Sequence, residues 1–206
     1  MLINDIFRKA SVIPVVEIQA LSSAVVLAQV FARAGLEVVE LTLRTSCAID
    51  ALAEMKRAEP DLIIGMGTVR TESDIERSLE GGADFLVSPG ASQSLLTALG
   101  RAGAPALPGV ATASEAMAAA DAGFRSLKFF PAASAGGADY LKALAGPLPD
   151  ISFCPTGGIG PAQLQDYLDL PNVACVGGSW IATKEMIAQS DWDAIERNAK
   201  LAASHS

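Results

Sequence analysis

Eight short apolar segments recur along this chain, starting roughly every 20–25 residues, which is the spacing of a strand followed by a crossover helix. They cover residues 12–18, 36–43, 62–66, 84–88, 104–108, 126–130, 151–155 and 173–177. Most are apolar at consecutive positions, as expected of strands with two buried faces. The repeat therefore predicts an α/β chain built on a parallel sheet.

Alanine-rich stretches with one apolar face separate these segments, and each is predicted to form a helix. They cover residues 22–35, 47–58, 71–80, 92–99, 112–120, 138–144, 161–168 and 192–203. Eight strand–helix units without a change of composition predict a single (β/α)8 TIM barrel over residues 1–206, with a short frayed C-terminal tail. A doubly wound open sheet is the alternative, but its glycine-rich turn is missing after the first strand.

The composition limits the chemistry that this chain can perform. Its single histidine, His205, is the penultimate residue, which argues against histidine triads, histidine metal sites and histidine proton relays. Cys47, Cys154 and Cys175 form no C-x-x-C motif, so we expect reduced thiols and no metal site. Catalysis would have to depend on lysine, carboxylate, hydroxyl or thiol groups.

The charge and hydropathy patterns bear on partners and location. The formal net charge is −8, with 15 basic and 23 acidic residues, so we expect neither nucleic acid nor an anionic membrane as a partner. The sequence shows no signal-peptide pattern and no apolar run of about 20 residues. These features predict a soluble, cytoplasmic protein.

Lys128 is the one lysine of six that lies inside an apolar strand segment. Strand alternation directs Leu127 and Phe129 toward the helices, so Lys128 and Phe130 should point into the barrel. Taken alone, Lys128 could equally extend its amine to the rim of the barrel.

A second strand supplies charged residues with the same alternation. Glu40, Thr42 and Arg44 share one face, and the second and sixth strands of an eight-stranded barrel lie opposite each other. Glu40 and Lys128 are therefore expected to approach each other near the barrel axis. A purely structural ion pair is the alternative, but such pairs are costly to desolvate, so we favour a catalytic site.

These side chains together suit one kind of chemistry. A desolvated lysine near a second cation has a populated neutral amine, which adds to ketones and forms a Schiff base. A glutamate can move protons at the bond that breaks, and an arginine can bind a carboxylate. Lys128, Glu40 and Arg44 thus predict a lysine-dependent aldolase that acts on a 2-keto acid and needs no cofactor.

Glycine pairs follow the last two predicted strands. Gly157 and Gly158 come after Thr156, and Gly178 precedes Ser179. In barrels of this kind, open backbone N–H groups after the seventh and eighth strands often bind phosphate. We therefore expect a phosphate site here, although each pair could also be only a tight turn.

The whole chain resembles the family of 2-keto-3-deoxy-6-phosphogluconate (KDPG) and 4-hydroxy-2-oxoglutarate (KHG) aldolases. The motifs that carry the resemblance are ELTLRT (40–45), GMGTV (65–69), VSPG (87–90), LPGVAT (107–112), LKFFPA (127–132), FCPTGGI (153–159) and VGGSW (176–180). The resemblance implies a homotrimer of small barrels with metal-free Schiff-base chemistry.

It also implies roles for individual residues: Lys128 as the Schiff-base lysine and Glu40 as the proton acceptor and donor. The pyruvate carboxylate would be bound by Arg44 and Thr68, and the pocket would be lined by Pro89 and Phe130. Phosphate would be bound by Gly157, Gly158, Gly178 and Ser179.

The implied reaction is cleavage of KDPG, a 2-keto acid phosphate, into pyruvate and glyceraldehyde 3-phosphate. Cleavage of KHG, a non-covalent phosphosugar isomerase and a binding barrel are the alternatives. Two departures from the family pattern concern Met66, which we expect to crowd the site slightly, and Glu17, which stands where phosphogalactonate aldolases tend to have arginine. The pattern leaves open whether Glu17 influences the phosphate end or the sugar end.

Overall fold

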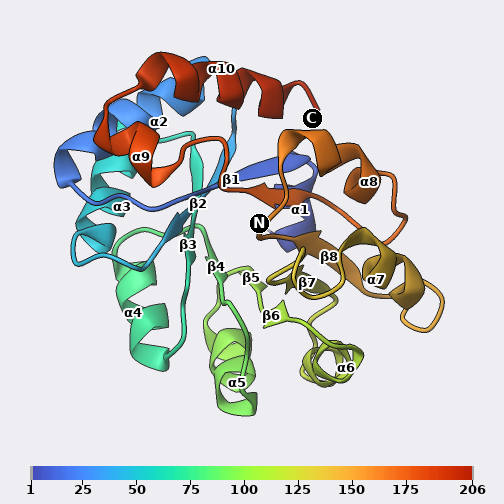
Figure 1. Cartoon of the computed structure of the whole chain (residues 1–206). Helices are drawn as coiled ribbons and strands as arrows, with labels where there is room; N and C mark the ends of the chain where they lie inside the picture. Colours follow the sequence, from blue (N-terminus) through green and yellow to red (C-terminus); the bar gives the residue numbers. More distant parts are fainter. Residues whose placement is uncertain (1, 206) are drawn as a thin grey trace.

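The computed structural model describes residues 2–205, and its strands lie at the centre with helices around them (Figure 1). The strands of this part of the chain are β1 (Val12–Val16), β2 (Val38–Thr42), β3 (Ile63–Gly67), β4 (Phe85–Val87), β5 (Ala106–Leu107), β6 (Gly109–Val110), β7 (Ser126–Phe129), β8 (Ser152–Pro155) and β9 (Val176–Gly178). The α helices are α1 (Ile3–Phe7), α2 (Ala24–Arg33), α3 (Ala48–Ala58), α4 (Glu72–Glu80), α5 (Gln93–Arg101), α6 (Ala113–Asp121), α7 (Gly137–Leu144), α8 (Leu164–Leu168), α9 (Lys184–Ala188) and α10 (Trp192–Ala203). The prediction of an α/β chain is confirmed.

The strands pair in parallel and form two sheets. One has the order β5-β4-β3-β2-β1-β9, and the other has the order β6-β7-β8. The fifth predicted strand is divided at Pro108, which has no N–H group to donate to a neighbouring strand. Leu107, before it, pairs with β4, and Gly109, after it, pairs with Lys128 of β7. The chain passes from one sheet to the other at this proline.

Isolated bridges connect the other ends of the two sheets. Phe153 pairs with Val173, and Thr156 pairs with Gly177, both in parallel. The eighth predicted strand therefore begins as a single bridge at Val173 and becomes β9 only at Val176.

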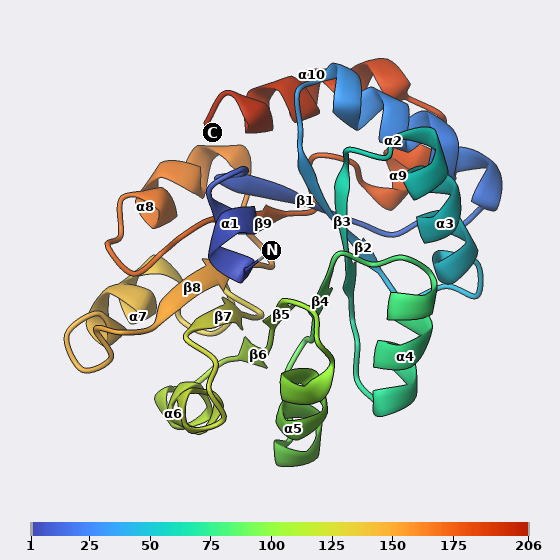
Figure 2. The ribbon, with the colours of Figure 1, turned by 180° about the vertical axis from the view of Figure 1, so that it is seen from behind.

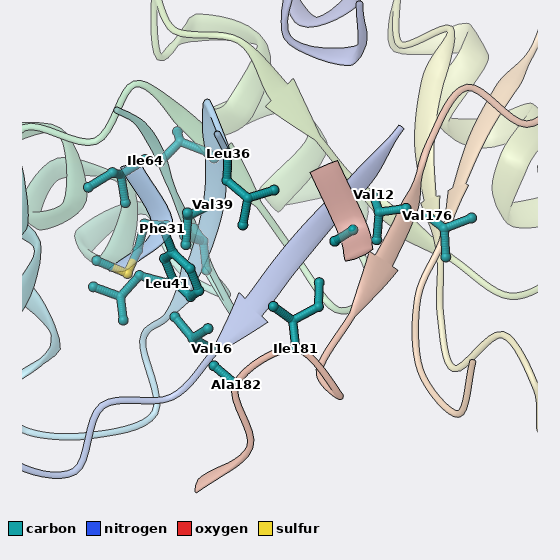
Figure 3. Close-up of a cluster of buried hydrophobic side chains, with 14 of the residues drawn as sticks. Val12, Val16, Phe31, Leu36, Val39, Leu41, Ile64, Val176, Ile181 and Ala182 are labelled. Atoms are coloured by element: carbon teal, nitrogen blue, oxygen red, sulfur yellow. The ribbon is translucent and has the colours of Figure 1, made fainter. Parts of the chain in front are cut away.

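One buried cluster fills the space between the strands and the helices. Val39 and Leu41 of β2 lie in it together with Phe31 of α2 (Figure 3). Each of these three side chains is fully buried. The even-numbered β2 residues Val38 and Glu40 alternate with them and face the other way, to the interior side of the curled strands.

A second cluster occupies that interior. Ile6 and Phe7 of α1 lie in it with Val38, Phe85 and Cys154 of the strands. Figure 2 shows α1 crossing in front of the strands. The hydroxyl of Ser126 donates to the side chain of Asn4 at 3.0 Å, which ties α1 to β7. A five-residue helix has too few turns for a periodic pattern, so the sequence did not predict α1.

Two of the predicted helices begin at threonine caps. Thr71 accepts a hydrogen bond from the backbone N–H of Asp74 at the start of α4, and Thr112 does the same for Glu115 at the start of α6. Helix α9 was not predicted. Within residues 2–205, no helix is both long and apolar enough to cross a membrane.

Candidate active site

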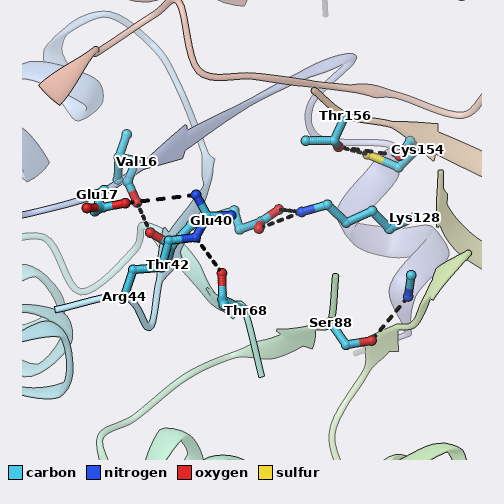
Figure 4. A network of polar contacts seen from close by, with 11 residues as sticks. Val16, Glu17, Glu40, Thr42, Arg44, Thr68, Ser88, Lys128, Cys154 and Thr156 are labelled. Carbon is cyan, nitrogen blue, oxygen red and sulfur yellow. Dashed lines mark hydrogen bonds and ion pairs between the residues drawn. The ribbon is translucent and has the colours of Figure 1, made fainter. Parts of the chain in front are cut away.

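Lys128 and Glu40 form a buried ion pair across the interior (Figure 4). The Lys128 amine donates to both carboxylate oxygens of Glu40, at 2.8 Å to Oε1 and 3.1 Å to Oε2. Each residue is only 4% exposed. The Nζ atom also lies 5.4 Å from the centre of the Phe130 ring. The structure thus brings together the two residues that the sequence singled out.

A glycine on the neighbouring strand makes room for this pair. Gly67 of β3 lies against the Glu40 side chain, and a Cβ atom at position 67 would overlap Oε1 of Glu40. Met66, one residue before, is fully buried in the outer cluster between the strands and the helices. The expectation that Met66 crowds the site was wrong, because alternation along β3 turns its side chain away from Glu40.

Two thiols lie in the same interior. Cys154 is in the interior cluster with Cys175, and both are free and buried. Burial raises the pKa of the Cys175 thiol well above its usual value, and hydrogen bonding to Cys154 and the charge of Glu40 add to the shift. Cys175 therefore stays protonated at neutral pH and is a poor nucleophile. The Cys175 thiol is therefore a weaker candidate nucleophile than the Lys128 amine.

Arg44 follows β2 and contacts the residues that directly follow the two neighbouring strands, Glu17 after β1 and Thr68 after β3. Its Nε donates to Thr68 Oγ1 at 3.0 Å, and its Nη1 lies 3.8 Å from Oε2 of Glu17 (Figure 4). Thr68 has a φ of 64°, a left-handed conformation that a β-branched residue rarely adopts. This conformation places its hydroxyl against Arg44, and the guanidinium is left partly exposed.

A cavity of about 360 Å³ lies at the carboxyl ends of β1, β2 and β9. Arg44 and Ser179 both line it, together with Thr42, Glu17 and Lys184. Thr42 is two residues after Glu40 on the same face of β2, whereas Glu40 and Lys128 do not themselves line the cavity. The structure thus brings the predicted carboxylate ligand and one predicted phosphate ligand to one cavity.

The other predicted phosphate residues lie on the adjoining strand ends. The Thr156–Gly177 bridge sets the loop of Gly157 and Gly158 beside Gly178. Gly157 and Gly158 have φ values of 101° and 78°, which explains why glycine is needed in this turn. The buried hydroxyl of Thr156 donates to its own strand, to the Cys154 carbonyl at 3.4 Å, so it does not point into the cavity.

Pro89 and Phe130 were predicted to line the pocket. Phe130 is half-buried beside the Lys128 amine. Pro89 is half-buried at the end of β4, and its backbone lies close to Gly109 of β6. Neither lines the cavity that contains Arg44 and Ser179.

Sequence reasoning missed one interaction at the rim. Glu17 pairs with Lys184 of α9 at 2.8 Å and lines the same cavity as Arg44 and Ser179. The only signal was a carboxylate at the end of a strand, because Lys184 belongs to a short helix that the sequence did not reveal.

Comparison with known proteins identifies the chain. A sequence model of the KDPG and KHG aldolase family matches residues 3–198. The chain belongs to that family. The 2-dehydro-3-deoxy-phosphogluconate aldolase of Pseudoalteromonas atlantica is 43% identical to this chain, over 97% of this chain and 93% of the relative. The KHG/KDPG aldolase of Escherichia coli K12 is 41% identical, over 96% and 92% of the two chains.

A solved relative shows covalent chemistry in the family. KDPG aldolase from Legionella pneumophila has a TM-score of 0.95 to this chain at 42% identity, and the match covers 98% of each chain. Its structure holds pyruvate, captured at low pH as a covalent carbinolamine intermediate. A carbinolamine forms when an amine adds to a carbonyl carbon, which is the first step of Schiff-base formation.

The close fit of Gly67 against Glu40 leads to a testable prediction. In Gly67→Ala, the added methyl group should displace the Glu40 carboxylate from the Lys128 amine. A misplacement of about 1 Å can lower a rate by about 10²-fold, so we expect kcat/KM for aldol cleavage to fall by that order. Steady-state kinetics measure the effect, with circular dichroism to verify folding.

Gly100→Ala is the matched control, because Gly100 lies in α5 with open space where its Cβ would be. It should leave kcat/KM unchanged. Wild-type activity in Gly67→Ala would mean that the position of Glu40 is not critical.

Proposed function

We propose that this chain is a class I aldolase that cleaves KDPG to pyruvate and glyceraldehyde 3-phosphate through a Schiff base on Lys128. The observation that carries the proposal is the buried ion pair between Lys128 and Glu40. An amine and a carboxylate at hydrogen-bonding distance can exchange a proton, which frees the amine for attack. The family membership and the names of the relatives agree with this chemistry.

The first half of the reaction forms the iminium and then breaks the C3–C4 bond. Once its proton has passed to Glu40, the Lys128 amine attacks C2 of the keto acid and gives a carbinolamine. Glu40 returns that proton to the carbinolamine hydroxyl, which leaves as water and gives the iminium. Glu40, directly or through a water, then takes the proton of the C4 hydroxyl. The C3–C4 bond breaks, its electron pair passes into the iminium to give an enamine, and glyceraldehyde 3-phosphate leaves.

The second half releases pyruvate. Glu40 returns its proton to C3 of the enamine, which restores the iminium. Water then adds to C2, and cleavage of the C–N bond releases pyruvate and the free amine. The low accessibility of Lys128 and Glu40 keeps bulk water from the enamine until the aldehyde has left.

The remaining predicted residues would bind the two ends of the substrate. The Arg44 guanidinium and the Thr68 hydroxyl, already in contact, would bind the keto-acid carboxylate. Pro89 and Phe130 would line the pocket around the reacting carbons. The phosphate would be bound by the loops of Thr156, Gly157, Gly158, Gly178 and Ser179.

Cleavage of KHG to pyruvate and glyoxylate is the second candidate, because the Escherichia coli relative is named for both activities. It would use the same lysine and glutamate without the phosphate loops. A non-covalent isomerase or a binding barrel is disfavoured, since neither requires a lysine buried against a carboxylate.

We further infer that the two sheets close into one eight-stranded barrel. The Thr156–Gly177 bridge supports closure on one side, and the passage from β5 to β6 through Pro108 supports it on the other. Residues 1–206 would then form one domain. We also propose a cytoplasmic homotrimer that requires no cofactor and binds neither nucleic acid nor membranes; its acidic charge agrees with this.

Substitution of Glu40 separates binding from turnover. In Glu40→Gln, pyruvate should still bind, while kcat for KDPG cleavage should fall by about 10²–10⁴-fold, the usual contribution of a general acid–base group. Glu37→Gln, at an exposed position three residues earlier, should retain full activity.

Removal of one partner of a buried ion pair lowers the free energy of unfolding by about 3–5 kcal/mol. The thermal stability of Glu40→Gln should therefore be measured together with its kinetics. A folded Glu40→Gln variant whose kcat drops less than about tenfold would assign the proton transfer to another group.

Substitution of Ser179 distinguishes the two candidate substrates. A hydrogen bond to a charged group is worth about 1.5–3 kcal/mol, so Ser179→Ala should lower kcat/KM for KDPG by about 10–100-fold. Its kcat/KM for KHG, which has no phosphate, should change little. Ser94→Ala, at an exposed position of α5, is the control.

Equal losses on both substrates would mean that Ser179 only supports the fold. A wild-type enzyme that prefers KHG would make the second candidate the function.

A further inference from the structure

Glu17 is held rigidly by one of its two carboxylate oxygens. Oε1 accepts from the Lys184 amine at 2.8 Å and from the Gln19 side-chain amide at 2.6 Å. Oε2 is buried and receives no hydrogen bond, and the guanidinium nitrogen Nη1 of Arg44 lies 3.8 Å away from it. The side chain as a whole is only 10% exposed.

An unsatisfied buried oxygen of this kind needs an explanation. A carboxylate oxygen that has lost water without gaining a donor is costly, and such groups in native proteins commonly have a functional role. Glu17 lines the same cavity as Arg44 and Ser179. A bound ligand can therefore supply the missing donor.

The chemistry of Glu17 selects the kind of group that can bind there. An ionised carboxylate has only acceptor atoms, so it binds an O–H or N–H donor and repels carboxylate and phosphate groups. In the proposed reaction, the keto-acid carboxylate goes to Arg44 and the C4 hydroxyl goes to Glu40. The C5 hydroxyl is the donor that remains, and it belongs to the aldehyde half of the substrate.

We propose that Glu17 is a specificity-determining residue that accepts a hydrogen bond from the hydroxyl next to the aldehyde carbon of the aldehyde substrate. The inference rests on the proposed aldolase function. In glyceraldehyde 3-phosphate, the carbon next to the aldehyde carries a hydroxyl, whereas in glyoxylate the carbon at that position is a carboxylate. The same side chain thus attracts the first aldehyde and repels the second.

The experiment runs the reaction in the direction of synthesis, from pyruvate and an aldehyde. Glyceraldehyde 3-phosphate is compared with 3-oxopropyl phosphate, which has the same length and phosphate but lacks the hydroxyl. Wild type should prefer the hydroxylated aldehyde by about 10–100-fold in kcat/KM, as one hydrogen bond to a charged group predicts. In Glu17→Met, which fills similar space without an acceptor oxygen, the ratio should fall close to one.

Glu185→Gln is the matched control, since Glu185 lines the same cavity and the substitution removes the same charge. It should leave the ratio at the wild-type value. Glu17→Gln keeps an acceptor oxygen and should retain a reduced preference.

Borohydride trapping of pyruvate in each variant reports the Schiff base separately from the aldehyde preference. Intact trapping with an unchanged ratio in Glu17→Met would overturn only the role of Glu17. A wild-type enzyme that shows no preference for the hydroxylated aldehyde would also overturn the role of Glu17, whether or not the Glu17→Met variant folds. Absence of trapping in the wild type would overturn the proposed function itself.

Discussion

The ion pair between Lys128 and Glu40 is the interaction on which the rest of the site depends. Two charges that are almost fully removed from water are costly unless each has a close partner, and the short contacts of the lysine amine with both oxygens of Glu40 provide that partner. The surrounding side chains fit this need. Gly67 leaves space for the carboxylate, and the interior cluster, with Ile6 and Phe7 of α1, packs the same interior with apolar groups.

The same pair accounts for the reactivity that we propose. An amine that can pass its proton to an adjacent carboxylate is able to attack a carbonyl carbon, and the carboxylate is then placed to act on the substrate. The nearby thiol of Cys175 does not compete, because burial keeps it protonated. Charge at the rim is arranged differently, since the Glu17 carboxylate pairs with two cations, Arg44 and Lys184.

Much of this arrangement was predictable from the sequence. Strand alternation placed Glu40 and Lys128 on inward faces, and the long apolar repeat gave the parallel α/β class. The short helices α1 and α9 were not predicted, because helices of five residues are too short to show a periodic pattern. The division of the fifth strand at Pro108 was not predicted either. The Met66 expectation was wrong because it treated a motif position as a pocket position without following alternation along β3. The Glu17–Lys184 pair was missed because Lys184 lies in α9, a short helix that the sequence did not reveal.

The most direct measurement of the central claim is borohydride reduction in the presence of pyruvate, followed by peptide mass mapping. The account predicts a reduced pyruvyl group on Lys128, no modification of Lys142 or Lys184, and no adduct in Lys128→Met. An adduct on another lysine, or full activity of Lys128→Met, would contradict it.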